Sequence, residues 1–227
     1  MEHLGSPLGS SPLFAALDEA AADALRELMT EVRVTRGQTL FREGDPGDRL
    51  YVVLAGKMKL VRSAADGREN LLAVLGPGEM FGELSAFDPR PRTATAAAVT
   101  AVTLSGLGHD ELEKWLLIHP EVASQLLAAM ARRLRRTNEA MTDLVFSDVP
   151  GRVAKALLDM AGRFGVTTDE GLRVPHDLTQ EELAQLVGAS RETVNKALAD
   201  FASRGFLRLE GRAVVLLDVE RLSRRAG

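Results

Sequence analysis

Residues 81–94 read FGELSAFDPRPRTA, and this stretch decides how the rest of the chain is interpreted. A Gly-Glu pair, Gly82 and Glu83, is followed nine residues after the glutamate by Arg92, a hydroxyl residue and small side chains. Glycine allows the backbone to approach a ligand closely, and the small residues after the arginine leave space for an anion. The alternative is an ordinary β-hairpin with a glutamate and an arginine on its surface.

The chemistry of this stretch suits a cyclic nucleotide. A carboxylate such as Glu83 accepts a hydrogen bond from a ribose 2′-hydroxyl, and a guanidinium beside a hydroxyl, as at Arg92 and Thr93, binds a singly charged phosphate. We therefore predict a ligand site that includes Gly82, Glu83, Leu84, Ser85, Arg92 and Thr93.

The composition indicates a globular protein of two domains. The 227 residues suffice for two hydrophobic cores, and contents of 45% hydrophobic and 26% charged residues argue against disorder. The absence of cysteine excludes disulfides, iron–sulfur clusters and thiolate chemistry. There is no apolar run of about 18 residues and no secretory signal, so we expect a cytoplasmic protein without a membrane partner. Residues 1–12 are rich in Gly, Ser and Pro and predict a flexible tail.

Short strand-like runs surround the ligand stretch. A short amphipathic helix is predicted within residues 13–28, and strands are predicted at 39–41, 50–54, 58–61, 71–75 and 94–104. Glycines punctuate these runs, and Asp66-Gly67 is typical of a hairpin turn. Many short strands with regular glycine turns favour a closed antiparallel roll of the jelly-roll type. We assign residues 13–109 to this β-roll.

A long helix is predicted in residues 110–147, with an interruption at Pro120. Beyond the proline, one side of the helix steps alternately by three and four residues, which is typical of a coiled-coil seam. The seam consists of Leu127, Met130, Leu134, Thr137, Met141 and Leu144. We predict a homodimer through residues 122–146, against the alternative of a helix packed on its own domain. Thr137 is polar and needs a partner in such a seam, which a ligand atom can provide.

Residues 148–227 have the pattern of a DNA-binding domain. Asp148 is a good N-cap for a new helix. In the segment 178–198, Thr179 and Glu182 form a capping box, Gly188 suits a tight turn, and Ser190 caps a second helix. These features predict a helix–turn–helix motif. A final hairpin carries Arg208 and Arg212, which are either wing contacts to DNA or ordinary solvated residues.

The second helix of this motif presents side chains suited to reading bases. Arg and Lys bind guanine edges and Glu accepts from cytosine, and a recognition helix places such residues near its N-terminus. The predicted DNA interface is Thr179, Gln180, Ser190, Arg191, Glu192, Thr193, Asn195 and Lys196. Residues 148–227 contain twelve Lys and Arg against twelve Asp and Glu, so attraction to phosphates must come from placement rather than net charge.

The order of these regions resembles the cyclic-AMP receptor (catabolite activator, CRP-FNR) family of bacterial transcription regulators. The resemblance is strongest in SRETV at Ser190–Val194, and three further stretches resemble the actinobacterial branch: Phe41–Tyr51, Asp66–Leu72 and Asp148–Val153. It implies an α+β fold with a cyclic-nucleotide-binding β-roll, a long dimerisation helix and a winged helix–turn–helix domain. It also implies one cAMP per subunit, with the ribose on Glu83 and the cyclic phosphate on Arg92 and Thr93.

Residues of the long helix complete the implied nucleotide site. The predicted nucleotide site includes Arg133. Thr137 is implied to receive the adenine amino group in its own subunit, and Asn138 is implied to reach the same group from the partner subunit. Lys196 stands where family members often have arginine, and this exchanges a bidentate fork for a point charge. Related sensors hold an iron–sulfur cluster or haem, but the chain lacks cysteine and its four histidines form no convincing ligand pair, so we expect no metal.

Two functions are compatible with these patterns. The first is a ligand-gated transcription regulator that binds pseudo-palindromic double-stranded DNA as a homodimer and works with RNA polymerase. The second is an architectural DNA-binding protein with weak ligand dependence. We expect no enzyme and no catalytic residues, because no nucleophile–base pair, metal cluster or nucleotide-triphosphate loop is evident.

Overall fold

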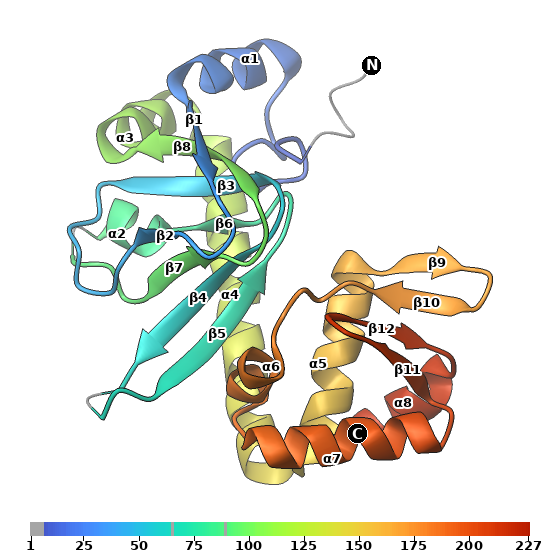
Figure 1. The fold of residues 1–227 in the computed structure, drawn as a ribbon. Helices are drawn as coiled ribbons and strands as arrows, with labels where there is room; N and C mark the ends of the chain where they lie inside the picture. The colour runs from blue at the N-terminus through green and yellow to red at the C-terminus, as the bar shows by residue number, and fades with distance from the viewer. Residues whose placement is uncertain (1–6, 65, 89) are drawn as a thin grey trace. The chain divides into compact units, whose positions relative to one another are not determined.

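The computed structural model describes residues 7–64, 66–88 and 90–227. The chain forms two compact units, which divide within α4 (Pro120–Phe146) after Arg135. In Figure 1 the N-terminal unit is built largely of strands, whereas helices and a small sheet form the C-terminal unit. The α+β class predicted from the sequence is confirmed, together with the roll, the long helix and the helix–turn–helix unit.

The N-terminal unit contains two four-stranded sheets, with strand orders β1-β8-β3-β6 and β2-β7-β4-β5. In chain order the elements up to α4 are α1 (Glu19–Leu28), β1 (Thr30–Val34), β2 (Thr39–Phe41), β3 (Arg49–Ala55), β4 (Met58–Ser63), β5 (Glu69–Leu75), β6 (Met80–Phe81), α2 (Glu83–Phe87), β7 (Thr95–Ala98), β8 (Val102–Gly108) and α3 (His109–Ile118).

Neighbouring residues of β3 contribute to two different cores. Val52 packs in a cluster with Leu13, Leu25 and Trp115, beneath the helices of this unit. Val53 belongs instead to the cluster with Phe81, inside the roll. Successive strand side chains point to opposite faces, so β3 joins the helical layer to the interior of the roll. This arrangement fixes the turn from β6 into α2, where the predicted ligand stretch begins.

The predicted strand over 94–104 is divided into β7 and β8, and β1 and β6 were not predicted. The division occurs because the intervening turn bonds to another part of the chain. The Val99 amide donates to the Lys57 carbonyl at 2.8 Å, and the Lys57 amide donates to the Thr100 hydroxyl at 2.9 Å. Such long-range bonds leave little trace in local sequence.

Residues 7–12 differ from the flexible tail predicted over residues 1–12, of which 1–6 lie outside the described residues. They form successive turns, and Ser11 is fully buried. Leu8 packs against the same cluster as Leu13 and Phe14, so apolar burial holds the segment down despite its Gly, Ser and Pro content. A Cβ added to Gly78 would lie 2.3 Å from the Ser10 hydroxyl, which shows how closely the segment approaches the roll.

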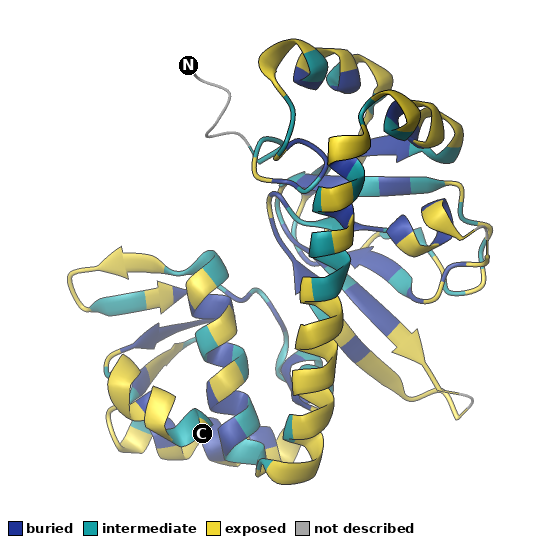
Figure 2. Cartoon of the chain, turned by 180° about the vertical axis from the view of Figure 1, so that it is seen from behind, coloured by how far each residue is buried: buried dark blue, intermediate teal, exposed yellow. Residues whose placement is uncertain are grey.

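The long helix α4 starts at Pro120, the residue predicted to interrupt the region, because proline is tolerated in a first helical turn. Val122 and Leu126, near its start, are buried. Figure 2 shows α4 largely exposed beyond these first turns. The exposed residues include the large apolar side chains of the predicted seam, Leu127, Leu134, Met141 and Leu144.

The C-terminal unit continues with α5 (Val149–Phe164), β9 (Val166–Thr168), β10 (Gly171–Val174), α6 (Gln180–Val187), α7 (Arg191–Ser203), β11 (Leu207–Glu210), β12 (Ala213–Leu216) and α8 (Val219–Ala226). Its four strands form one sheet in the order β11-β12-β10-β9, so the terminal hairpin is extended by two strands. The predicted N-cap is present, since the Asp148 carboxylate accepts from the Gly151 amide at 2.9 Å.

Candidate functional site

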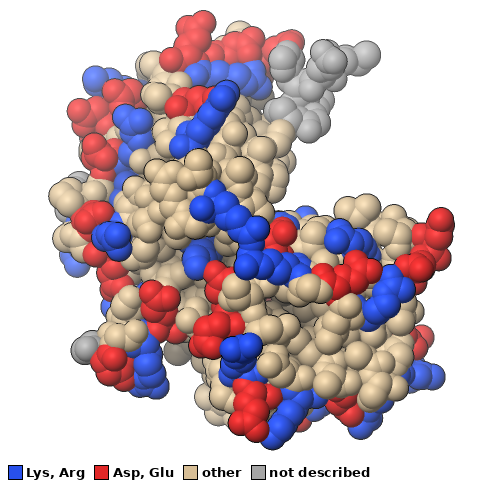
Figure 3. All heavy atoms as spheres, viewed as in Figure 1, with Lys and Arg blue, Asp and Glu red and all other residues tan. Residues whose placement is uncertain are grey.

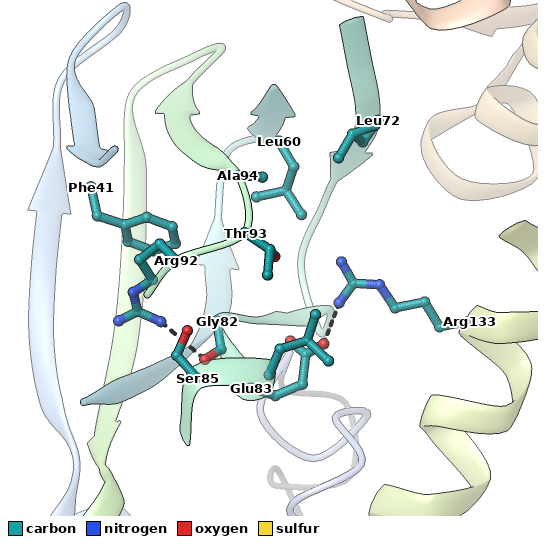
Figure 4. A pocket seen from close by; sticks show the side chains of 11 residues that line it. Phe41, Leu60, Leu72, Gly82, Glu83, Ser85, Arg92, Thr93, Ala94 and Arg133 are labelled. Carbon is teal, nitrogen blue, oxygen red and sulfur yellow. Dashed lines mark hydrogen bonds and ion pairs between the residues drawn. The ribbon is translucent and has the colours of Figure 1, made fainter. Parts of the chain in front are cut away.

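A small cavity in the N-terminal unit collects the predicted ligand residues (Figure 4). It is lined by Phe41, Leu60, Leu72, Gly82, Glu83, Leu84, Ser85, Arg92, Thr93, Ala94 and Arg133. Seven of the predicted nucleotide-site residues therefore lie together, namely Gly82, Glu83, Leu84, Ser85, Arg92, Thr93 and Arg133. Their roles toward a ligand stay predictions.

Glu83 is a buried carboxylate at the start of α2. Its side chain is 3% exposed, and Oε1 accepts from Nη1 of Arg133 at 2.5 Å. Oε2 is buried without a hydrogen-bond partner among the described residues. A buried carboxylate oxygen costs free energy unless it accepts a hydrogen bond, so this atom suits a hydroxyl donor from a ligand.

Arg92 faces the same cavity from the loop that precedes β7. Nη1 donates to the Gly82 carbonyl at 3.0 Å and Nη2 to the Arg49 carbonyl at 2.7 Å. Nε is buried with no hydrogen-bond partner in the described part of the chain. Burial lowers the pKa of Arg92, because removing the guanidinium from water disfavours its charged form. An anionic group in the cavity would offset that cost.

Two glycines allow the backbone to pass close to Arg92. Gly82 has a φ of 78°, and a Cβ there would lie 2.8 Å from Nη1 of Arg92. A Cβ on Gly47 would lie 2.4 Å from Cβ of Ser85 and 2.9 Å from Nε of Arg92. The close approach at Gly82 was predicted from the sequence, whereas no role was predicted for Gly47.

The cavity measures about 50 Å³, whereas sites for small molecules typically measure some 300 Å³ or more. Binding a nucleotide therefore requires side chains at its edge to move. Leu72, Leu84 and Arg133 are suited to this, because each is substantially exposed. The donors and acceptors fit a ligand that combines a hydroxyl with an anion.

Thr137 and Asn138 lie on α4 about one turn beyond Arg133, and both are exposed. They do not line the cavity described above. Their implied contacts with adenine stay predictions.

The helix–turn–helix motif forms through the caps that the sequence predicts. The Thr179 hydroxyl accepts from the Glu182 amide at 3.1 Å, and the Glu182 carboxylate accepts from the Thr179 amide at 2.7 Å, which confirms the capping box. Gly188 ends α6 with a φ of 63°, and the Ser190 hydroxyl accepts from the Thr193 amide at 3.2 Å at the start of α7.

The residues predicted to read bases lie on the outer side of α7. Arg191, Glu192, Thr193, Asn195 and Lys196 are exposed, while Val194 and Leu198 are buried against the unit. Lys196 donates to Glu192 at 2.7 Å, one turn away. Both side chains are about three-quarters exposed, so this ion pair contributes little stability. Ser190 is also exposed, and Thr179 and Gln180 are partly exposed at the start of α6.

Arg152 connects the start of α5 to the turn before the recognition helix, a role that the sequence did not reveal. Nε donates to the Val187 carbonyl at 2.8 Å, and Nη1 donates to the Ser147 carbonyl at 2.6 Å. Both carbonyls lie at helix ends, where backbone acceptors lack helical partners. The arginine thus fixes the end of α6 relative to the end of α4.

Charge on the C-terminal unit is balanced, as the composition indicates. Figure 3 shows positive and negative side chains intermixed over the visible face rather than gathered in a broad basic patch. Arg208 on β11 forms ion pairs with Glu170 and Glu210, and its hydrogen bond to Glu170 is the main reason that its pKa is raised. A wing contact by Arg208 would have to compete with these carboxylates.

Family models match both units of the chain. Residues 31–119 match a cyclic nucleotide-binding domain, and residues 151–225 match a Crp-like helix-turn-helix domain. A CRP-like cAMP-activated global transcriptional regulator of Mycobacterium tuberculosis is 56% identical over 219 residues, which cover 96% of this chain and 98% of that protein. The chain belongs to the CRP/FNR family of transcription regulators. The family resemblance inferred from the sequence is therefore confirmed.

More distant relatives share the architecture. A cyclic AMP receptor protein of Thermus thermophilus is 37% identical, covering 92% of this chain and 95% of its own. The solved structure of CLP, a c-di-GMP-responsive regulator from Xanthomonas campestris, matches with a TM-score of 0.76 at 26% identity, over 88% of this chain and 99% of its own. Because that neighbour responds to a different nucleotide, the fold alone does not determine the ligand.

The described residues contain no cluster of three or more His, Cys, Asp or Glu side chains able to hold a metal ion. Within the same part of the chain, no helix has the length and apolar character needed to cross a membrane.

Proposed function

We propose that the protein is a cAMP-responsive transcription regulator that binds pseudo-palindromic DNA as a homodimer, acting in the cytoplasm with RNA polymerase. One observation carries the proposal. A single cavity holds a buried acceptor, Oε2 of Glu83, and a buried donor, Nε of Arg92, and neither has a hydrogen-bond partner within the described residues. A cyclic nucleotide presents a ribose hydroxyl and a phosphate that complement these two groups.

Each subunit binds one cAMP in its roll. Glu83 accepts from the ribose 2′-hydroxyl, Arg92 and Thr93 bind the cyclic phosphate, and Gly82, Leu84 and Ser85 line the site. Arg133 balances the charge of Glu83 from α4. The adenine amino group reaches Thr137, and Asn138 of the partner subunit. The 56% identity to a regulator described as cAMP-activated supports the choice of cAMP.

The exposed seam of α4 supports the homodimer. Leu127, Leu134 and Met141 are each more than 60% exposed, which is unfavourable for large apolar side chains in a regular 3–4 pattern unless another helix covers them. A two-fold dimer presents two recognition helices, and this arrangement reads two half-sites of a pseudo-palindrome.

Calorimetric titration of Arg92→Ala with cAMP tests the ligand site. Removing the charged partner of a buried phosphate should cost about 2–5 kcal/mol of binding free energy, and Arg92→Lys should lose less because the charge is kept. A loss of affinity below about threefold in Arg92→Ala contradicts the role of Arg92.

Titration of a palindromic site selected in vitro, with and without cAMP, tests the regulation. A regulator of the proposed kind binds its site more tightly with cAMP and discriminates against unrelated DNA. Equal affinity for many sequences, unchanged by cAMP, would favour the architectural alternative.

A further inference from the structure

Phe41 lies at the end of β2, where no ligand role was expected. Its ring forms a cluster with Tyr51 and Phe81, at centroid separations of 6.2 and 6.0 Å. The guanidinium carbon of Arg92 lies 4.2 Å from the centroid of the Phe41 ring. This separation is within the range of about 6 Å over which a cation is attracted to a ring face. Figure 4 shows the Phe41 ring beside the Arg92 side chain.

Three contacts fix the guanidinium of Arg92. The carbonyls of Gly82 and Arg49 hold Nη1 and Nη2, and the Phe41 ring covers one face. Only these two Nη atoms donate to protein acceptors, since Nε has no hydrogen-bond partner among the described residues. A guanidinium has five N–H donors, so donors are left over for an anion in the cavity.

The chemistry of the side chain that covers the guanidinium matters because Arg92 is buried. Burial lowers the pKa of Arg92, so the charged form requires compensation. A carboxylate in the position of Phe41 would compensate the charge, but it would occupy N–H donors and repel a phosphate. The face of a phenyl ring attracts the cation and leaves its in-plane N–H groups free.

We propose that Phe41 is a positioning residue for the phosphate of the bound nucleotide. It acts through Arg92, so it contributes to binding of the cyclic phosphate and not to binding of the nucleoside. This inference rests on the proposed function, in which Arg92 binds the phosphate.

Calorimetry of the full-length protein with cAMP and with adenosine tests the inference. Phe41→Leu keeps an apolar side chain and removes the ring face. It should weaken cAMP binding by about three- to thirtyfold and change adenosine binding by less than about twofold. Phe41→Tyr keeps the ring and should bind cAMP within about twofold of the parent. Phe206→Leu is the matched control, because it makes the same ring-to-leucine change in an aromatic pair with Phe201 of the C-terminal unit. It should leave the ratio of the two affinities unchanged.

A double-mutant cycle provides a second measurement that needs no adenosine. In an Arg92→Ala background, Phe41→Leu should cause no further loss of cAMP affinity, because the group through which it acts is absent. Parent-like cAMP binding by Phe41→Leu, equal losses for cAMP and adenosine, or a full additional loss in the Arg92→Ala background would each overturn the inference. Parent-like cAMP binding by Arg92→Ala alone would instead overturn the proposed function, so the two failures are distinguishable.

Discussion

Two buried ionisable residues lower the stability of the fold and are suited to bind a ligand. Glu83 and Arg92 are ionisable and almost fully buried, and each has one polar atom without a partner in the described part of the chain. A buried charge is tolerated only when other groups offset its desolvation. Here Arg133, two backbone carbonyls and the Phe41 ring do so in part. The two buried atoms that still lack a hydrogen-bond partner are therefore suited to bind a ligand.

A substitution at Arg191 tests the proposed recognition of bases. Arg191→Ala should relax the preference for one G·C pair in each half-site, at a cost of roughly 1–3 kcal/mol, because a bidentate contact to guanine is lost. Fluorescence anisotropy with single-base variants of the selected site measures this. Arg204→Ala is the matched control, since Arg204 is exposed at the other end of α7 and pairs with Asp200. Uniform weakening on all sequences would show that Arg191 contacts phosphate instead.

Helix ends and turns were predictable where residues close together in the sequence determine them. The capping box at Thr179, the glycine turn at Gly188 and the N-cap at Asp148 involve residues within four positions of one another, so the sequence displays them directly. Strands β1 and β6, helix α8 and the contacts of Phe41 and Arg152 depend on partners far along the chain. Local patterns carry no record of such pairing, so these features emerged only from the structure.

Substitutions at Asp148 test how much the N-cap of α5 contributes to stability. Asp148→Ala should lower the free energy of unfolding by about 1 kcal/mol, and Asp148→Asn by less, since asparagine also caps helices. A hydrogen bond from Arg225 and another from the Gly151 amide hold the pKa of Asp148 below its usual value of 3.8. A lowered folded-state pKa stabilises the protein above 3.8, and this contribution disappears as the pH falls through the lowered value.

Urea unfolding at neutral and acidic pH measures these effects. The difference between the parent and Asp148→Asn should therefore shrink below about pH 3.8. Asp159→Ala serves as the control, because Asp159 lies within α5, away from its N-cap, and pairs with Arg163 through a side chain that is 53% exposed. An equal loss in both alanine variants would mean that the cap has no special role.

For the whole molecule, the proposed function depends on a second copy of the chain. The two matched domain models account for a ligand site and a DNA-reading motif in each subunit. A pseudo-palindromic site requires two recognition helices, and the exposed apolar seam of α4 is the surface suited to pair them. Dimerisation and tight DNA binding should therefore be lost together.

Leu134→Glu tests this dependence. Leu134 is 62% exposed in the single chain but would be enclosed between helices in the dimer, where an unpaired carboxylate in each subunit should cost about 3 kcal/mol or more. The dimer dissociation constant, measured by sedimentation, should rise by at least about a hundredfold. Binding to a full palindromic site should fall toward that of a single half-site. Arg132→Glu places the same charge on the opposite side of the same exposed helix and should leave both measurements unchanged. If Leu134→Glu stays dimeric and binds the full site like the parent, the seam of α4 is not the dimer interface.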